Sequence, residues 1–138
     1  MTARNFALSF GIVFLLAGLS GFVPRLSPDH VHSGLNVTAG SRLAMGLFPV
    51  NVLHNLIHTA FGIWGVLASR GPGAARGYGR SVAVIYGLLT IMGLVPLTST
   101  TFGLVPIYGN DIWLHAVLAL VATYFGFVHR DGNGEAVA

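Results

Sequence analysis

The sequence predicts an all-α integral membrane protein, in which four transmembrane helices form a bundle and both termini face the cytoplasm. The first observation is composition: 54% of the 138 residues are hydrophobic and 8% are charged. Soluble domains carry about 25% charged residues, so this composition favours the membrane class. The second is that the apolar residues form four runs, each close to the roughly 20 residues that cross a bilayer. The third is that the arginines lie outside these runs.

The four runs define a single domain over residues 1–138, with spans at about residues 6–23, 50–69, 81–97 and 111–128. A rival interpretation of the first run is a cleaved signal peptide, but the run is long and lacks an Ala-x-Ala-like site. Residues 43–48 are expected to lie along the membrane interface. The remaining predictions are loops at residues 71–80 and 98–110 and a disordered tail at residues 129–138.

The arginines predict the orientation of the four spans. Five lie on one side of the membrane and two on the other: Arg4, Arg70, Arg76, Arg80 and Arg130 against Arg25 and Arg42. Since cytoplasmic loops are richer in basic residues, this split predicts cytoplasmic termini in an inner, cytoplasmic-type membrane. The excess of arginine over acidic residues therefore indicates the orientation in the membrane, and nucleic acid is not an expected partner. The expected partners are the lipid bilayer and, in one interpretation, other membrane subunits.

Glycines and an internal repeat predict how the helices pack. Small residues allow close helix contacts in lipid, and such contacts are expected at Gly11, Gly18, Gly62, Gly65, Gly87 and Gly93. The pairs Leu53-His54 and Leu114-His115 lie at similar positions in the second and fourth runs. This weak parallel repeat indicates two helical hairpins.

A polar face interrupts the second apolar run. Helical spacing places Asn51, His54, Asn55 and His58 on this face. At a rise of about 1.5 Å per residue, His58 lies roughly 12 Å inside the span, within a hydrocarbon core about 30 Å thick. Polar side chains at that depth are costly, and they mark a candidate functional site.

The fourth run repeats this pattern, because Asp111 and His115 lie one turn apart on a face continued by small residues. His54 and His115 lie at a matched depth below the same membrane surface. We therefore expect one cluster in the outer half of the bundle, adjoined by Asn51 and Asn55 and formed by His54, His58, Asp111 and His115.

Three chemistries suit this cluster. Imidazoles with a carboxylate bind Zn, Cu, Fe or Ni, and a carboxylate that bonds a ligating histidine fixes its tautomer. Histidines also ligate haem iron or the magnesium of a chlorophyll. Chains of histidine and aspartate relay protons in membranes. The absence of cysteine excludes thiolate sites.

The alternative is a non-catalytic accessory subunit of a larger membrane complex. The polar groups would then hydrogen-bond one another and hold the helices together. No nucleophile paired with a base stands out, and the His-x-x-x-His pair lacks the glutamate of a zinc protease. The sequence gives no support for an enzyme.

Several motifs occur together along the chain: Gly46 to Asn51, His54-Asn55-x-x-His58 with Gly62 and Gly65, Tyr86-Gly87 through Gly93, and Asp111 with Leu114-His115. They resemble a bacterial family of small four-helix membrane proteins catalogued as domain of unknown function 4383. The resemblance covers roughly residues 7–127. It implies four membrane-spanning helices and no assigned activity.

Overall fold

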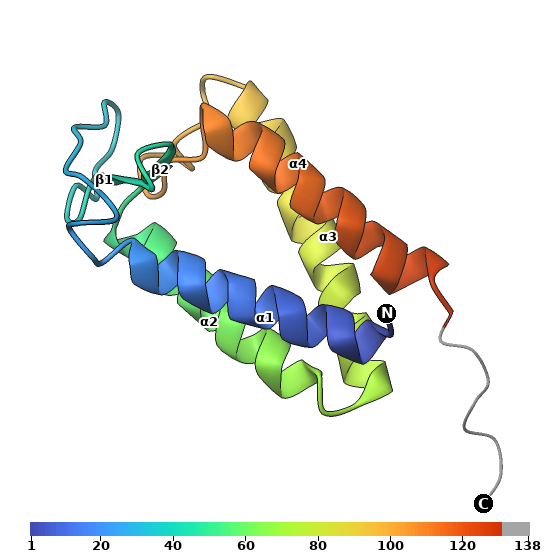
Figure 1. The fold of residues 1–138 in the computed structure, drawn as a ribbon. Coiled ribbons are helices and arrows are strands. Elements are labelled where there is room, and N and C mark those ends of the chain that lie inside the picture. The colour runs from blue at the N-terminus through green and yellow to red at the C-terminus, as the bar shows by residue number, and fades with distance from the viewer. Residues whose placement is uncertain (131–138) are drawn as a thin grey trace, which may run out of the picture.

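The computed structural model describes residues 1–130, which form four α-helices and a short β-hairpin (Figure 1). In chain order the elements are α1 (Ala3–Ser20), β1 (Arg42–Ala44), β2 (Phe48–Val50), α2 (Val52–Ala68), α3 (Pro72–Leu94), α4 (Asn110–Thr123) and a π-helical continuation, η1 (Tyr124–Val128). Apart from the start of α3, the helix boundaries agree with the predicted spans to within three residues. The disorder predicted for the tail falls outside the described residues from position 131 onward.

The helices pack as two antiparallel pairs, α1 with α2 and α3 with α4 (Figure 1). Arg4 Nε donates to the carbonyl of Ser69 at 2.9 Å, which joins the start of α1 to the end of α2. Arg80 Nε donates to the carbonyl of Gly126 at 3.0 Å, which joins α3 to η1. Position 130 and the N-terminus therefore lie near the α2–α3 connection, at what we call the terminal end. The β-hairpin lies at the opposite, hairpin end (Figure 1).

Glycines bring the backbones of α1 and α2 together. A Cβ on Gly62 would lie 2.5 Å from Leu15 Cγ, and one on Gly11 would lie 2.6 Å from the Val66 nitrogen. No side chain fits at either position without moving the helices apart. Contacts predicted for three further glycines are also present, at Gly18, Gly65 and Gly93. The prediction for Gly87 is wrong, because a Cβ there would meet nothing within 4 Å.

The outer surfaces of the helices are apolar and part of the interior is polar. Large apolar side chains such as Leu16, Leu88 and Leu120 are exposed, whereas histidines and asparagines of α2 are buried. Three helices, α1, α3 and α4 with η1, are long and apolar enough to cross a membrane. Helix α2 is apolar and shorter, with 17 residues, at the lower end of the range of about 17–25 residues for spanning helices.

Helix α3 begins at Pro72 rather than near Ser81, so the loop predicted at residues 71–80 is wrong. Proline suits the first position of a helix, where the missing N–H has no helical partner. Tyr78 in this first part is fully buried, with its ring centroid 5.2 Å from that of Trp64. This burial outweighs the low helix propensity of the glycines that made the segment resemble a loop.

The two long connections at the hairpin end form an ordered cap over the bundle. Residues 43–48, for which a position along the membrane interface stays a prediction, belong to the antiparallel hairpin in which Arg42 pairs with Val50. Met45 and Gly46 have positive φ in its turn, a conformation found in tight hairpin turns. The backbone N–H of Asn36 donates to the carbonyl of Gly103 at 2.7 Å, which joins the first connection to the second.

His32 is a second link in this cap. Its Nδ1 bonds the Tyr108 hydroxyl at 2.7 Å, and its Nε2 bonds the Arg42 carbonyl at 2.9 Å. These bonds hold His32 in a buried position. Its neighbour His30 is exposed.

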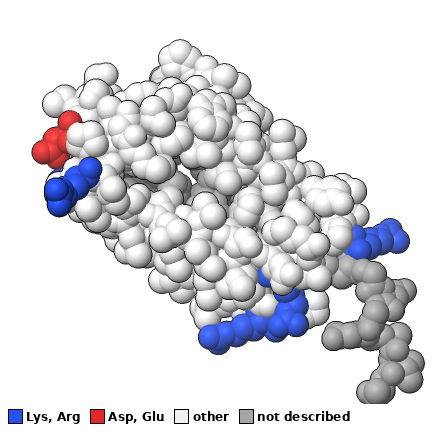
Figure 2. Space-filling model, viewed as in Figure 1, with Lys and Arg blue, Asp and Glu red and all other residues white. Residues whose placement is uncertain are grey.

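Figure 2 shows charged side chains near the hairpin end and near the terminal end, with an uncharged surface between them. An uncharged band between two charged ends is typical of a protein surrounded by lipid. The described arginines divide as Arg25 and Arg42 at the hairpin end and Arg4, Arg70, Arg76, Arg80 and Arg130 at the terminal end.

Candidate metal centre

The first two turns of α2 present a buried polar face to the interior. Asn51 caps the helix, since its Oδ1 accepts a hydrogen bond from the His54 N–H at 2.9 Å. This cap fixes where α2 begins. From that start, helical spacing of three and four residues brings His54, Asn55 and His58 onto the buried side.

The first two turns of α4 supply the opposite wall. The helix begins after Gly109, whose φ of +66° is rarely adopted by other residues. Asp111 and His115 follow on one face, and each is 1% exposed. The carboxylate lies in the first turn, where the positive end of the helix dipole favours negative charge.

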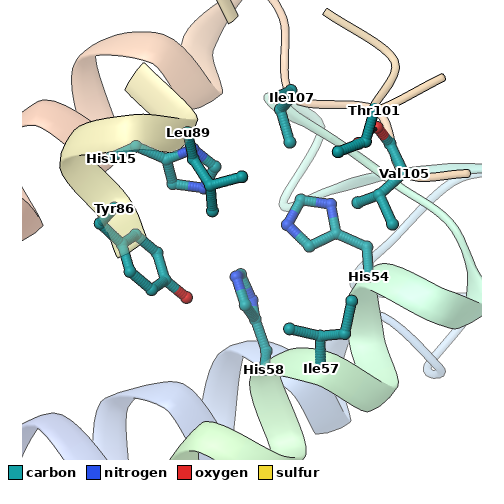
Figure 3. A pocket seen from close by; sticks show the side chains of 9 residues that line it. All are labelled: His54, Ile57, His58, Tyr86, Leu89, Thr101, Val105, Ile107 and His115. Atoms are coloured by element: carbon teal, nitrogen blue, oxygen red, sulfur yellow. Dashed lines mark hydrogen bonds between the residues drawn. The ribbon is translucent and has the colours of Figure 1, made fainter. Parts of the chain in front are cut away.

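Three imidazoles meet between α2 and α4. His54, His58 and His115 each offer a ring nitrogen such that all three nitrogens lie within 4.8 Å of one another. The ring centroids of His54 and His58 are 4.5 Å apart, and those of His54 and His115 are 6.2 Å apart. Figure 3 shows the three rings grouped around one cavity.

Asp111 lies beside His54 and does not line this cavity. Its Oδ2 is 3.9 Å from His54 Nδ1, which is too long for a hydrogen bond. Of the four residues predicted to cluster, the three histidines therefore face one another, and Asp111 faces His54 alone. A carboxylate next to one imidazole nitrogen leaves the other nitrogen available as a ligand.

The cavity has a volume of about 70 Å³. Since a water occupies about 30 Å³ in the liquid, the space holds about two waters, or one ion with a small ligand. A tetrapyrrole cannot be enclosed in this volume. Besides the histidines, the lining consists of one aromatic, one hydroxyl and four aliphatic residues: Tyr86, Thr101, Ile57, Leu89, Val105 and Ile107 (Figure 3).

Sequence reasoning missed Tyr86 and the second connection as parts of this cavity. Tyr86 lies edge-on to His115, with ring centroids 5.0 Å apart and planes at 86°. Its spacing from Val82, another buried residue of α3, is the helical signal that indicates an inward position. Thr101 and Phe102 have positive φ, which is uncommon for residues other than glycine. Nothing in the composition of this uncharged loop indicated that it covers the histidines.

Several polar atoms of the cluster are buried without a hydrogen-bond partner in the described part of the chain. They are His54 Nδ1, Asp111 Oδ2 and both ring nitrogens of His115. A buried polar group left unsatisfied costs about 1–3 kcal/mol. Such groups in a folded protein call for an explanation, of which an ion or ordered water is one.

The two asparagines predicted to adjoin the cluster have different positions. Asn51 Nδ2 donates to the carbonyls of Val37 at 2.9 Å and Leu104 at 2.7 Å, so it joins both connections to α2. Asn55 faces α1, where any side chain on Gly21 would collide with its amide. Neither polar atom of the Asn55 amide has a hydrogen-bond partner among residues 1–130.

Aromatic side chains close the cavity on the side of the terminal end. The ring of Phe14 lies 5.5 Å from that of His58 and 5.3 Å from that of Tyr86. Phe61 packs against both Phe14 and Tyr86. The apolar cluster then continues through smaller and aromatic residues, among them Ala3, Phe6, Ala7 and Tyr78.

Comparison with known proteins identifies a family over most of the chain. The family model described as "Domain of unknown function (DUF4383)" matches residues 4–128, which include every residue of the cavity and all of the four helices except Ala3. No match was found among curated proteins or among solved structures.

Proposed function

The chain belongs to the DUF4383 family, a domain of unknown function, and from this premise we propose that it is a membrane protein that binds a transition metal ion. The ligands are His54, His58 and His115. We also propose that α2 crosses the bilayer together with the three longer helices, in an inner, cytoplasmic-type membrane. The terminal end, with five arginines against two, then faces the cytoplasm.

One observation carries the metal proposal: three imidazole nitrogens lie within 4.8 Å of one another at a cavity between the helices. An ion bound at about 2.0–2.1 Å from each nitrogen in tetrahedral geometry would hold the nitrogens about 3.3 Å apart. For coordination, the most distant pair of nitrogens must therefore come closer by at most about 1.5 Å, the difference between 4.8 Å and the ligand spacing. Imidazole donors favour Zn, Cu, Ni and Fe over the oxygen-seeking Mg and Ca.

Asp111 supports this assignment from behind His54. A carboxylate that accepts from the Nδ1–H of a histidine makes that ring a stronger ligand through Nε2 and fixes its orientation. When an ion binds, we expect the present distance of 3.9 Å between Asp111 Oδ2 and His54 Nδ1 to shorten to that of a hydrogen bond.

The unsatisfied atoms weigh against a cluster that serves only to hold helices together. In that case the polar groups would hydrogen-bond one another, since each such bond contributes about 0.6–2 kcal/mol in lipid. His115 instead has no hydrogen-bond partner for either ring nitrogen within residues 1–130. Proton passage is disfavoured because aromatic side chains around Phe14 and Phe61 fill the bundle beyond His58.

The test is metal binding by the purified, tag-free chain in detergent or lipid nanodiscs. Titration with Zn²⁺ or Co²⁺ should give one tightly bound ion per chain, and metal analysis of the protein as purified should agree. His58→Ala and His115→Ala should each weaken binding by at least tenfold. His30→Ala, which changes an exposed histidine of the cap, is the matched control and should bind as the wild type does. Equal binding by all four proteins would refute the proposal.

A further inference from the structure

We propose that the ion held by the three histidines keeps one exchangeable coordination position, which binds a small ligand of two or three non-hydrogen atoms. This inference rests on the proposed metal site and adds to it a reactive or sensory role. A structural ion would have no such position.

The number of protein ligands is the first argument. Structural zinc sites have four protein ligands, whereas catalytic sites have three and leave the fourth position to water or substrate. Within the described residues, the cavity offers three imidazoles and, beyond them, only the hydroxyls of Tyr86 and Thr101 as polar groups. The Thr101 hydroxyl donates to the carbonyl of Val105 at 2.5 Å, and neutral hydroxyls are not among the usual zinc ligands. Asp111 lies outside the lining.

The space around the imidazoles is the second argument. With about 70 Å³ available, an ion leaves room for roughly one or two water-sized groups. The rest of the lining is mainly aliphatic and includes Ile57, Leu89 and Ile107. Such walls make no hydrogen bonds, so they suit a small neutral molecule, and a singly charged one is admitted only because it binds the ion directly. An amino acid or a sugar is larger than this volume of about 70 Å³.

The position of the cavity under the cap gives the third argument. Thr101 lines the cavity, while its neighbour Thr100 lines a polar surface pocket together with Ser99 and Tyr108. One turn of the second connection therefore separates the cavity from the hairpin end. Aromatic rings close the cavity toward the terminal end, so a small ligand is expected to approach the ion from elsewhere.

The experiment uses Co²⁺ as the metal and azide as the small ligand. The full chain in detergent is loaded with Co²⁺, and the visible absorption of the ion is followed during an azide titration. We expect a saturable change in the spectrum, with no comparable change on addition of benzoate, which is too large for the cavity. A Co²⁺ spectrum that does not respond to azide would overturn this inference and leave the metal site standing. Failure to bind Co²⁺ would overturn both.

A matched pair of variants locates the azide. Leu89→Trp places a large ring in the cavity and should weaken azide binding at least tenfold while Co²⁺ remains bound. Leu88→Trp changes the neighbouring residue, which is 57% exposed on the outer surface of α3, and should leave the titration unchanged. Equal azide affinity in the two variants would overturn the inference. If Leu89→Trp does not fold, Leu89→Phe makes the same comparison against Leu88→Phe.

Discussion

Asn51 accepts a hydrogen bond from the backbone N–H of His54 at 2.9 Å and thereby ties the start of α2 to the first histidine of the cluster. The same side chain donates from Nδ2 to the carbonyls of Val37 and Leu104, which belong to the two connections of the cap. One buried amide thus determines where α2 begins and holds the cap above the cavity. In the sequence this residue was assigned to the surroundings of the cluster, and its contact to both connections was not foreseen.

Replacing Asn51 should therefore destabilise the fold more than replacing Asn110, the first residue of α4. Asn51→Ala removes a helix cap worth about 1 kcal/mol and leaves two carbonyls without a donor, each worth about 1 kcal/mol. We expect a loss of about 2–4 kcal/mol, measured by thermal or denaturant unfolding in detergent. Asn110→Ala is the control. It removes two exposed hydrogen bonds, one to the Leu47 carbonyl and one from Trp113 Nε1, and should cost about 1 kcal/mol or less because water replaces both partners. Equal losses would contradict this role of Asn51.

Asp111→Asn should weaken metal binding without removing a ligand. The amide keeps the size of the carboxylate but not its charge, so it stabilises the Nδ1–H of His54 less well. We expect the metal affinity to fall by about 10–100-fold, with one ion per chain still bound at saturation. Competition with a chelator of known affinity measures the change. If the stoichiometry fell as well, Asp111 would be a direct ligand.

His32 should make the cap sensitive to pH. Burial lowers the pKa of His32 below its usual value of 6.5, although the hydrogen bond to the Arg42 carbonyl opposes this shift. His30, whose ring centroid lies 4.8 Å away, and Tyr108 are the other titratable groups beside it. The folded state therefore binds fewer protons at this site than the unfolded state. Its contribution to stability is complete above about pH 6.5 and is lost as the pH falls below that value.

Unfolding of the wild type and of His32→Gln between pH 7.5 and pH 5 isolates this contribution. The variant should be less stable at pH 7.5, and its stability should fall less steeply on acidification. Parallel stability curves for the two proteins would mean that other groups cause the pH dependence.

The helices and the composition of the cluster could be predicted from the sequence, because both follow from local periodicity. The spacing of His54 and His58, and of Asp111 and His115, depends only on helical geometry. The start of α3 could not be predicted from local sequence. The first part of the helix is stabilised by packing of Tyr78 against Trp64, which lies in another helix.

The cap was unpredictable for a related reason. The bond between His32 and Tyr108 joins residues far apart in the chain, and neither segment shows a periodic pattern. The resemblance noted from the motifs proved correct as a family assignment. It supplied no ligand, so the cavity and its unsatisfied nitrogens are the basis for the metal proposal.

Single cysteines should report the proposed orientation, since the chain has no native cysteine. Gly73→Cys lies at the start of α3, where a side chain would meet nothing within 4 Å. Val31→Cys lies in the cap, and Val31 is 91% exposed. In intact cells an impermeant thiol reagent should label the cap position and not the α3 position. Labelling of both positions from outside would contradict a cytoplasmic terminal end.

Packing of α1 on α2 gives the last prediction. A side chain at Gly62 would start 2.5 Å from Leu15 Cγ and 2.6 Å from the Leu15 backbone nitrogen, so the two helices must separate to admit it. Gly62→Leu should therefore destabilise the bundle by about 1–3 kcal/mol through overpacking. Because His58 lies one turn away on the same buried face of α2, separation of the helices should also weaken metal binding.

Gly87→Leu is the matched control, because it makes the same exchange in α3 at a position with no neighbour within 4 Å. Leucine has a higher helix propensity than glycine, by up to about 1 kcal/mol, so this variant should be as stable as the wild type or more so. Thermal unfolding in the same detergent compares the pair. Similar melting temperatures for the two variants would mean that α1 and α2 can move apart at Gly62 at little cost, and that their close contact does not hold the histidines in place.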